Sequence, residues 1–311
     1  MQTTSNVLMI EPIAFGFNAE TAQNNYFQQN DDTPEAKIQA NALCEFRNMV
    51  NMLRDKGINV IVEKDTLEPH TPDSIFPNNW VSFHSCGRVV LYPMCAVNRR
   101  PERREEILKR IEQEGFFIKE KIDLTGYEKE ESPEFLEGTG SMILDRENHI
   151  AYACLSQRTN RHLFELFCRE MEYRPVMFSS FQSVDNKRLP IYHTNVMMCV
   201  ANKYVVICLD TIDDKEERQA VEHSIKDSGK EIIEISESQM HQFAGNMLQV
   251  SNSMGESFLV MSDSAYCSLR EDQIETIEKY NQIIHPAIPT IEHYGGGSAR
   301  CMIAEVFLPK K

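Results

Sequence analysis

The sequence predicts an α/β fold in which five similar modules, each built from strands and a helix, form a closed ring. Five short segments resemble one another, and each leads from a small or polar residue into an apolar strand; they begin at Asn79, Gly140, Asn195, Asn246 and Arg300. After the first four come a polar turn, a second strand and a stretch with the apolar spacing of a helix. Neither terminus has the polar cap that an open solenoid needs, so we expect the ring to close.

The expected elements follow in order along the chain. A strand over residues 7–10 and a helix over 34–56 precede the first repeat. The second strands are predicted at 89–92, 149–153, 204–209 and 258–261, and the helices at 101–111, 160–171, 213–228 and 269–280. In the first of these four helices Pro101 suits the opening turn, and Ile107, Leu108 and Ile111 have helical spacing.

If the strand over 7–10 completes the last module, residues 1–311 form a single domain with the helices on the outside. The repeat of about 50–60 residues is longer than most solenoid units. An open α/β sheet without symmetry is the alternative. In a ring, the openings of the five segments lie at the same end of each module. We therefore expect their polar side chains to gather at one mouth of the central axis, which is a natural place for a site.

The composition of the chain argues against some classes of binding partner. The 311 residues include 32 Lys and Arg against 47 Asp and Glu, giving a formal net charge of −15. This argues against nucleic acid and against anionic membranes as partners, and no apolar run is long enough for a bilayer span. The nine cysteines are scattered without a CxxC pair, which favours reduced thiols in a cytoplasmic protein over zinc or disulfides. The start of the chain does not resemble a signal peptide.

A thiol, an imidazole and carboxylates occupy comparable positions in different modules. Asp73, Glu137 and His193 lie near the openings of three segments, and Cys301 follows a run of three glycines. Each residue alone has an ordinary structural explanation, but together they are the components of a nucleophilic triad. Arg158 lies between a strand and a helix, where it suits a bidentate contact with a substrate carboxylate.

The fivefold repeat with these residues resembles the pentein superfamily of guanidine-modifying enzymes, which includes arginine deiminases, dimethylarginine dimethylaminohydrolases and amidinotransferases. The resemblance covers essentially the whole chain and implies a five-bladed α/β propeller. Segments 72–80, 192–200 and 295–307 are most similar to the amidinotransferase-like citrulline-utilisation hydrolases. Asp73 matches a family Asp near the amino-acid end of the substrate.

The resemblance also implies roles for individual residues. Cys301 would be the nucleophile, His193 the general acid and base, and Glu137 the group that orients the imidazole. Arg158, in a Ser-x-Arg-Thr stretch, would bind the substrate α-carboxylate. Arg103, near the predicted start of a helix, is a second and weaker match to a carboxylate-binding arginine. No metal or organic cofactor is implied, because a thiol, an imidazole and water suffice.

Two residues depart from the family pattern in an informative way. Asn79 and Asn195 stand where guanidinium-binding penteins and deiminases have Asp. A guanidinium is a cation that only donates hydrogen bonds, whereas a ureido group is neutral and carries an acceptor oxygen. Buried carboxylates left without a cationic partner cost about 3–5 kcal/mol each. The two amides therefore shift the preference of the site from guanidinium towards ureido.

The sequence thus predicts a cysteine hydrolase of an arginine-related amino acid. Citrulline is the first choice of substrate, cleaved to ornithine, ammonia and carbon dioxide through a covalent Cys301 intermediate, with Asn79 and Asn195 as donors to the developing charge. An arginine deiminase or an amidinotransferase using the same triad is the alternative. A non-catalytic amino-acid-binding protein is the alternative from a different class.

Overall fold

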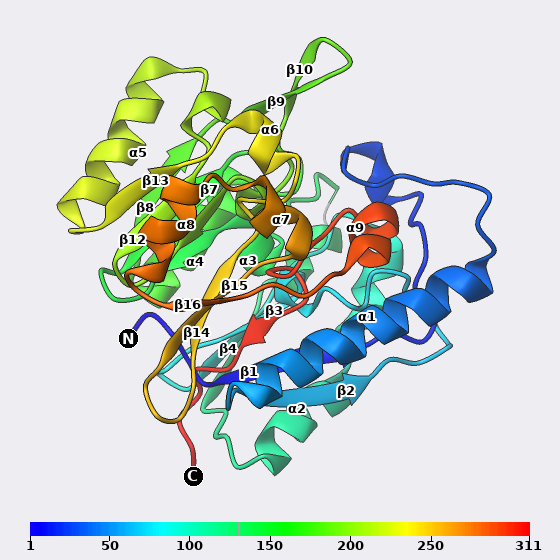
Figure 1. Cartoon of the computed structure of the whole chain (residues 1–311). Helices are drawn as coiled ribbons and strands as arrows, with labels where there is room; N and C mark the ends of the chain where they lie inside the picture. Colours follow the sequence, from blue (N-terminus) through cyan, green and yellow to red (C-terminus); the bar gives the residue numbers. More distant parts are fainter. Residues whose placement is uncertain (130) are drawn as a thin grey trace.

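The computed structural model describes residues 1–129 and 131–311 as five three-stranded sheets and one two-stranded hairpin, with the longer helices outside the sheets (Figure 1). All five sheets share one topology. The first strand runs antiparallel to the second, and the second runs parallel to the third after a helical crossover. The predicted ring of strand–strand–helix–strand modules is confirmed as a five-bladed α/β propeller.

The strands of each blade are short. The first blade contains β17 (Ala304–Glu305), β1 (Asn6–Glu11) and β2 (Asn59–Lys64). The next two blades contain β3 (Val81–Phe83), β4 (Arg88–Leu91) and β5 (Glu120–Asp123), and β6 (Ile143–Asp145), β7 (Ile150–Cys154) and β8 (Arg174–Phe178). The last two contain β11 (Met198–Val200), β12 (Tyr204–Ile207) and β13 (Glu231–Glu234), and β14 (Leu248–Ser251), β15 (Ser257–Val260) and β16 (Gln282–Ile284). The hairpin is β9 (Phe181–Val184) with β10 (Lys187–Pro190).

The two ends of the chain close the ring. Val7 in β1 pairs with Glu305 in antiparallel β17 on one side and with Val60 in parallel β2 on the other. Figure 1 shows the red C-terminal strand beside the blue N-terminal one. The first blade is therefore completed by residues some three hundred positions apart in the sequence.

Helices connect the second and third strands of the blades. They are α1 (Glu35–Asp55), α2 (Glu105–Gln113), α4 (Arg161–Met171), α5 (Lys215–Asp227) and, in the last blade, α7 (Asp263–Ser268) with α8 (Glu271–Glu278). The helix predicted at 101–111 instead begins at Glu105, because Pro101 lies in a 3-10 turn over Val97–Glu102 and Arg104 has extended backbone. In the part of the chain that the structure describes, no helix is long and apolar enough to cross a membrane.

Each helix buries one apolar face against its blade, as α4 illustrates. Its predicted apolar residues are all buried, namely Leu163, Phe164, Phe167 and Met171. Each such side chain contributes about 1.5–3 kcal/mol on burial. The Asn160 side chain accepts hydrogen bonds from the first free amides of the helix, which adds about 1 kcal/mol. The neighbouring strand β7 is buried along its whole length, because one face packs in the core cluster of α4 and the other in the core cluster of the next blade.

Short turns at the start of the blades position the candidate site. The 3-10 turns Pro77–Asn79 and Thr194–Val196 and the short helix α3 (Gly138–Ser141) each precede the first strand of a blade. The helix α3 contacts both turns. The remaining short helices are α6 (Glu237–Met240) and α9 (Pro289–Gly295), and α9 leads into the glycine run before Cys301. The starts of four blades, including the loop that carries Cys301 ahead of β17, therefore contribute side chains to one place near the axis.

Candidate active site

A buried carboxylate and a buried imidazole form a close pair. His193 Nε2 lies 2.7 Å from Glu137 Oε2, and both side chains are almost completely buried. Burial alone would raise the pKa of Glu137, but the charge of Arg158 and the hydrogen bond from His193 outweigh it and lower that pKa to about 2. Burial lowers the pKa of His193 to about 4. At neutral pH the ring is thus neutral, with its proton on Nε2 and a lone pair on Nδ1.

The backbone holds Glu137 in place at the start of α3. Its Oε1 accepts a hydrogen bond of 2.9 Å from the amide of Cys95, and its own amide donates to Ser141 Oγ at 2.8 Å. Arg158 Nη1 lies 3.5 Å from Oε2. The carboxylate therefore has a single orientation, which fixes the plane of the His193 ring as an orienting carboxylate must.

The sulfur of Cys301 is held by two side-chain amides. Asn195 Nδ2 lies 3.3 Å and Asn246 Nδ2 3.2 Å from Cys301 Sγ. The amide of Arg300 donates to Asn246 Oδ1 at 3.0 Å, which directs the NH2 group of Asn246 towards the sulfur. Two N–H donors aimed at one atom suit a sulfur that becomes anionic. No hydrogen bond joins Cys301 to His193 among the described residues, although both side chains line the same cavity.

Asn246 is a site residue that the sequence reasoning did not select. It opens the fourth repeat, at the position that Asn195 occupies in the third. That equivalence was the available signal. It was insufficient on its own because the openers of the repeats do not share one place: Asn79 lines the cavity, whereas Arg300 lines a separate pocket.

The other end of the cavity carries Asp73 and two arginines. Asp73 Oδ2 accepts hydrogen bonds from Asn18 Nδ2 at 2.7 Å and Thr21 Oγ1 at 3.1 Å. Its Oδ1 is buried and has no partner within residues 1–129 and 131–311. Burial raises the pKa of Asp73, although the charge of Arg99 opposes this. Arg158 and Arg99 line the same cavity, so this end offers both an acceptor and cations.

Arg103 does not reach the cavity. Its guanidinium lies 2.5 Å from Glu128 Oε1 and donates to the Tyr92 carbonyl oxygen at 3.2 Å. Arg99, four positions earlier, lines the cavity instead. Arg103 is expected from the resemblance of this segment to a family helix start, but the segment Val97–Glu102 forms a 3-10 turn and the arginine that lines the cavity is Arg99. The 3-10 turn turns Arg99 inwards and leaves Arg103 at its end.

A polar segment that the sequence reasoning also missed covers the cavity. Asn24 Oδ1 accepts from Arg158 Nε at 2.8 Å, and Asn25 Nδ2 lies 3.3 Å from the Gly296 carbonyl oxygen. Thr21 contacts Asp73, as described above. The enclosed free space is only about 20 Å³, which is about the room needed for one water molecule. Because Asn24 occupies the Arg158 guanidinium and this free space is small, we expect residues 18–28 to move when an amino acid binds.

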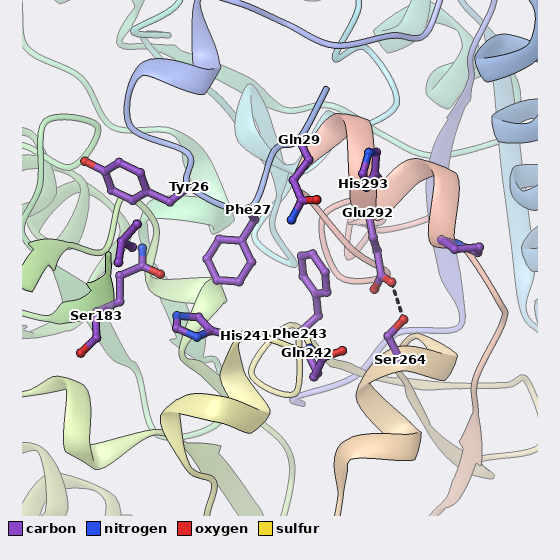
Figure 2. A pocket seen from close by; sticks show the side chains of 13 residues that line it. Tyr26, Phe27, Gln29, Ser183, His241, Gln242, Phe243, Ser264, Glu292 and His293 are labelled. Atoms are coloured by element: carbon purple, nitrogen blue, oxygen red, sulfur yellow. Dashed lines mark hydrogen bonds between the residues drawn. The ribbon is translucent and has the colours of Figure 1, made fainter. Parts of the chain in front are cut away.

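A larger pocket lies next to this cavity, beyond Phe27 (Figure 2). The Phe27 ring centroid lies 6.5 Å from that of Tyr192, which lines the candidate site, and 5.2 Å from that of Phe243, which lines the neighbouring pocket. Figure 2 also shows Glu292 of α9 bonded to Ser264 in this pocket. None of the candidate catalytic side chains is among the described residues lining it. Cys301 and His193 line the smaller cavity instead.

Comparisons with known proteins agree with this architecture. A family model described as N,N dimethylarginine dimethylhydrolase, eukaryotic, matches residues 11–308. No curated protein matches the chain. Among solved structures the chain is similar to unliganded ArgZ, an arginine dihydrolase from the ornithine–ammonia cycle in cyanobacteria, with a TM-score of 0.72 and 18% identity. That match covers 98% of this chain and 41% of the other, so the chain spans about two fifths of that enzyme's length.

Two further structures match along their full length. One is the N-terminal domain of ArgZ covalently bound to a reaction intermediate, with a TM-score of 0.69, 18% identity and coverage of 98% of this chain and 99% of that one. The other is a dimethylarginine dimethylaminohydrolase in an adduct with S-methyl-L-thiocitrulline, with a TM-score of 0.63, 13% identity and coverage of 98% and 100%. At such identities the likeness shows a shared fold.

Proposed function

Since the chain belongs to the N,N dimethylarginine dimethylhydrolase family, eukaryotic, a family of guanidino-modifying hydrolases, we propose that its own substrate is citrulline, a related amino acid with a ureido group. It acts as a cysteine hydrolase that converts citrulline to ornithine, ammonia and carbon dioxide. Cys301 is the nucleophile, His193 the acid and base, and Glu137 the orienting carboxylate. The sequence resemblance and the shared cavity support these roles.

One observation is the main reason for proposing citrulline as the substrate. The polar groups beside the thiol are amides: Asn195 and Asn246 contact Cys301 Sγ, and Asn79 lines the same cavity. A guanidinium bound here would lose its hydration without gaining an ionised carboxylate beside its carbon, and such a desolvated charge is costly. A neutral ureido group avoids that cost. The carboxylates of the site are at its far end or are already paired with His193.

The proposed reaction uses only these groups and water. His193 takes the thiol proton as Cys301 Sγ attacks the ureido carbon, and the proton passes to the departing nitrogen. Amide N–H groups stabilise the negative charge that develops on the oxygen. Water, activated by the same imidazole, then displaces the sulfur, and the carbamate product loses carbon dioxide. One citrulline and one water thus give one ornithine, one ammonia and one carbon dioxide.

The far end of the cavity suits the α-amino acid part of the substrate. The unpartnered Oδ1 of Asp73 can accept from an α-ammonium group. Arg158 binds the α-carboxylate once the covering segment moves and Asn24 leaves its guanidinium. This arrangement favours a free amino acid over a simple amine such as agmatine.

Arginine is a second candidate substrate, because family membership points to guanidino compounds. Hydrolysis of arginine to citrulline at this site, followed by the ureido step, would release two molecules of ammonia. The same thiol, imidazole and carboxylate serve both steps. Amidino transfer would need an amine in place of water.

Substrate incubation separates these possibilities. The purified protein is given citrulline, arginine, dimethylarginine or agmatine, and ammonia, methylamines and ornithine are measured. Equal amounts of ornithine and ammonia from citrulline, with Cys301→Ser inactive, support the proposal. Two ammonia per ornithine from arginine favour the second candidate. Citrulline that accumulates from arginine or dimethylarginine without being consumed would overturn the assignment of citrulline as substrate.

A further inference from the structure

We infer that Arg99 is a positioning residue that locks the Asn79 amide with its NH2 group facing the reacting carbon, and thereby selects substrates with an oxygen on that carbon. The inference deepens the proposed function and rests on it for the identity of the reacting group. It assigns a specificity role to a residue that does not itself carry out the chemistry.

The hydrogen bond between the two residues defines the amide orientation. Arg99 Nη1 lies 2.8 Å from Asn79 Oδ1. A guanidinium has only donors, so the atom that faces it must be the amide oxygen. The usual ambiguity between the oxygen and nitrogen of an asparagine is thereby removed by chemistry. Asn79 Nδ2 is left buried and without a hydrogen-bond partner within the described part of the chain.

The unpartnered nitrogen lies next to the catalytic imidazole. A Cβ added at Gly140 would lie 2.3 Å from Asn79 Nδ2 and 2.8 Å from His193 Nδ1. The missing side chain of Gly140 therefore leaves room for both nitrogens. Because Asn79, His193 and Cys301 line one cavity, the NH2 group borders the space in which the carbon attacked by the thiol must lie.

Arg99 itself has no freedom to turn away. Its Nε and Nη2 donate to the two oxygens of Glu102 at 2.8 and 2.9 Å, and Nη2 also reaches the Phe76 carbonyl oxygen at 3.2 Å. Arg99 and Glu102 are both almost completely buried. A bidentate pair of this kind fixes a guanidinium in position and direction. The fixed Arg99 guanidinium consequently holds the Asn79 amide in one orientation.

A fixed donor at this point discriminates between two planar groups of similar shape. The ureido oxygen accepts the hydrogen bond from Asn79 Nδ2 and accepts it more strongly as it becomes anionic. A guanidinium has an NH2 group in the same place, so that donor faces donor and both remain unpaired. Asn195 complements this arrangement, since its Oδ1 is a buried acceptor without a partner among the described residues and can receive a ureido N–H. A preference of tenfold to hundredfold is the size that such a mismatch produces.

The test compares citrulline with arginine in variants that alter Arg99. Arg99→Met with Glu102→Gln removes the donor without leaving a buried carboxylate unpaired, and Arg99→Lys retains a donor. We expect the ratio of kcat/KM for citrulline to that for arginine to fall at least tenfold in the double variant and to be partly retained with Lys. Arg103→Met, which breaks a comparable ion pair outside the cavity, is the matched control and should leave the ratio unchanged.

A mutant cycle distinguishes positioning from a general structural effect. In an Asn79→Ala background there is no amide to orient, so the double substitution should cause no further change in the ratio. An equal fall in that background, or an unchanged ratio in the double variant that folds as the wild type does, would overturn the inference.

Binding measurements keep this result separate from the proposed function. Calorimetry on Cys301→Ser gives the Kd for citrulline and arginine with and without the Arg99 and Glu102 substitutions. If the wild type does not turn over citrulline but Cys301→Ser binds it more tightly than arginine in an Arg99-dependent manner, the function is refuted and the inference stands. If arginine binds more tightly with Arg99 intact, the inference is refuted.

Discussion

Replacing Glu137 with Gln should abolish most activity by reversing the proton position on His193. Oε1 of residue 137 accepts from the Cys95 amide at 2.9 Å, so the single oxygen of a Gln must occupy that place. The NH2 group then faces His193 Nε2, which lies 2.7 Å from Oε2 in the native site. Nε2 can only become an acceptor, and the ring proton moves to Nδ1. The lone pair that faces the cavity is lost, and kcat should fall about 10³–10⁴-fold, equivalent to about 4–5 kcal/mol in the barrier.

The assay for this prediction is ammonia release from citrulline under saturating conditions, with folding checked by circular dichroism. Glu128→Gln is a matched control, because Glu128 is another buried carboxylate that accepts from a backbone amide, of Met94, and pairs with an arginine, Arg103. It should lose stability in the same way but keep kcat within about threefold. A folded Glu137→Gln protein with more than a tenth of the wild-type kcat would refute the tautomer argument.

Three further predictions follow from the same site. Asn246→Ala removes one of the two N–H donors to Cys301 Sγ, so iodoacetamide alkylation of Cys301 at pH 7 should slow about tenfold or more; an unchanged rate would contradict the role of that amide. Because burial lowers the pKa of His193 to about 4, the stability that its neutral ring provides is complete above about pH 6.5 and is lost as the pH falls to 4, by about 3 kcal/mol. Urea unfolding should show this loss in the wild type and less of it in His193→Gln, and parallel pH curves would argue against it. Gly140→Ala brings a Cβ to 2.3 Å from Asn79 Nδ2 and should reduce kcat/KM for citrulline about a hundredfold, which steady-state kinetics will check.

The repeated blades could be predicted because the second strand and the outer helix of each blade bury apolar residues in the same way. The second strands and the outer helices carry apolar residues at regular spacing, and their positions agree with the structure to within a few residues. The third strands give an uneven signal, since β2 buries Val60 and Ile61 whereas β5 does not bury any residue fully. In β5 only Ile122 is even partly buried, so the strand has no apolar alternation and is defined by its parallel pairing with β4. The hairpin of β9 and β10 likewise has no counterpart in the other blades and no signal in the repeat.

The site residues at the openings of the repeats could be predicted from the sequence. Those whose direction depends on the local backbone could not. Cys301 and His193 lie at the openings of blades and do line one cavity, while their catalytic roles remain a prediction. The choice between Arg99 and Arg103 depends on a 3-10 turn that residue spacing does not encode. The covering segment has no regular spacing of apolar residues from which its position could be predicted. It is held instead by Asn and Thr side chains that contact polar groups of the cavity.

The pairing of β1 with β17 has a consequence for biosynthesis. Cys301 lies three residues before β17, so its sulfur reaches Asn195 and Asn246 only when the last strand has docked beside the first. A nascent polypeptide still emerging from the ribosome would already possess its imidazole and carboxylate but not a positioned thiol. Chains that terminate early would leave β1 with an unpaired edge and no reactive centre. The thiol, the imidazole and the carboxylate would thus come together only after β17 has been synthesised.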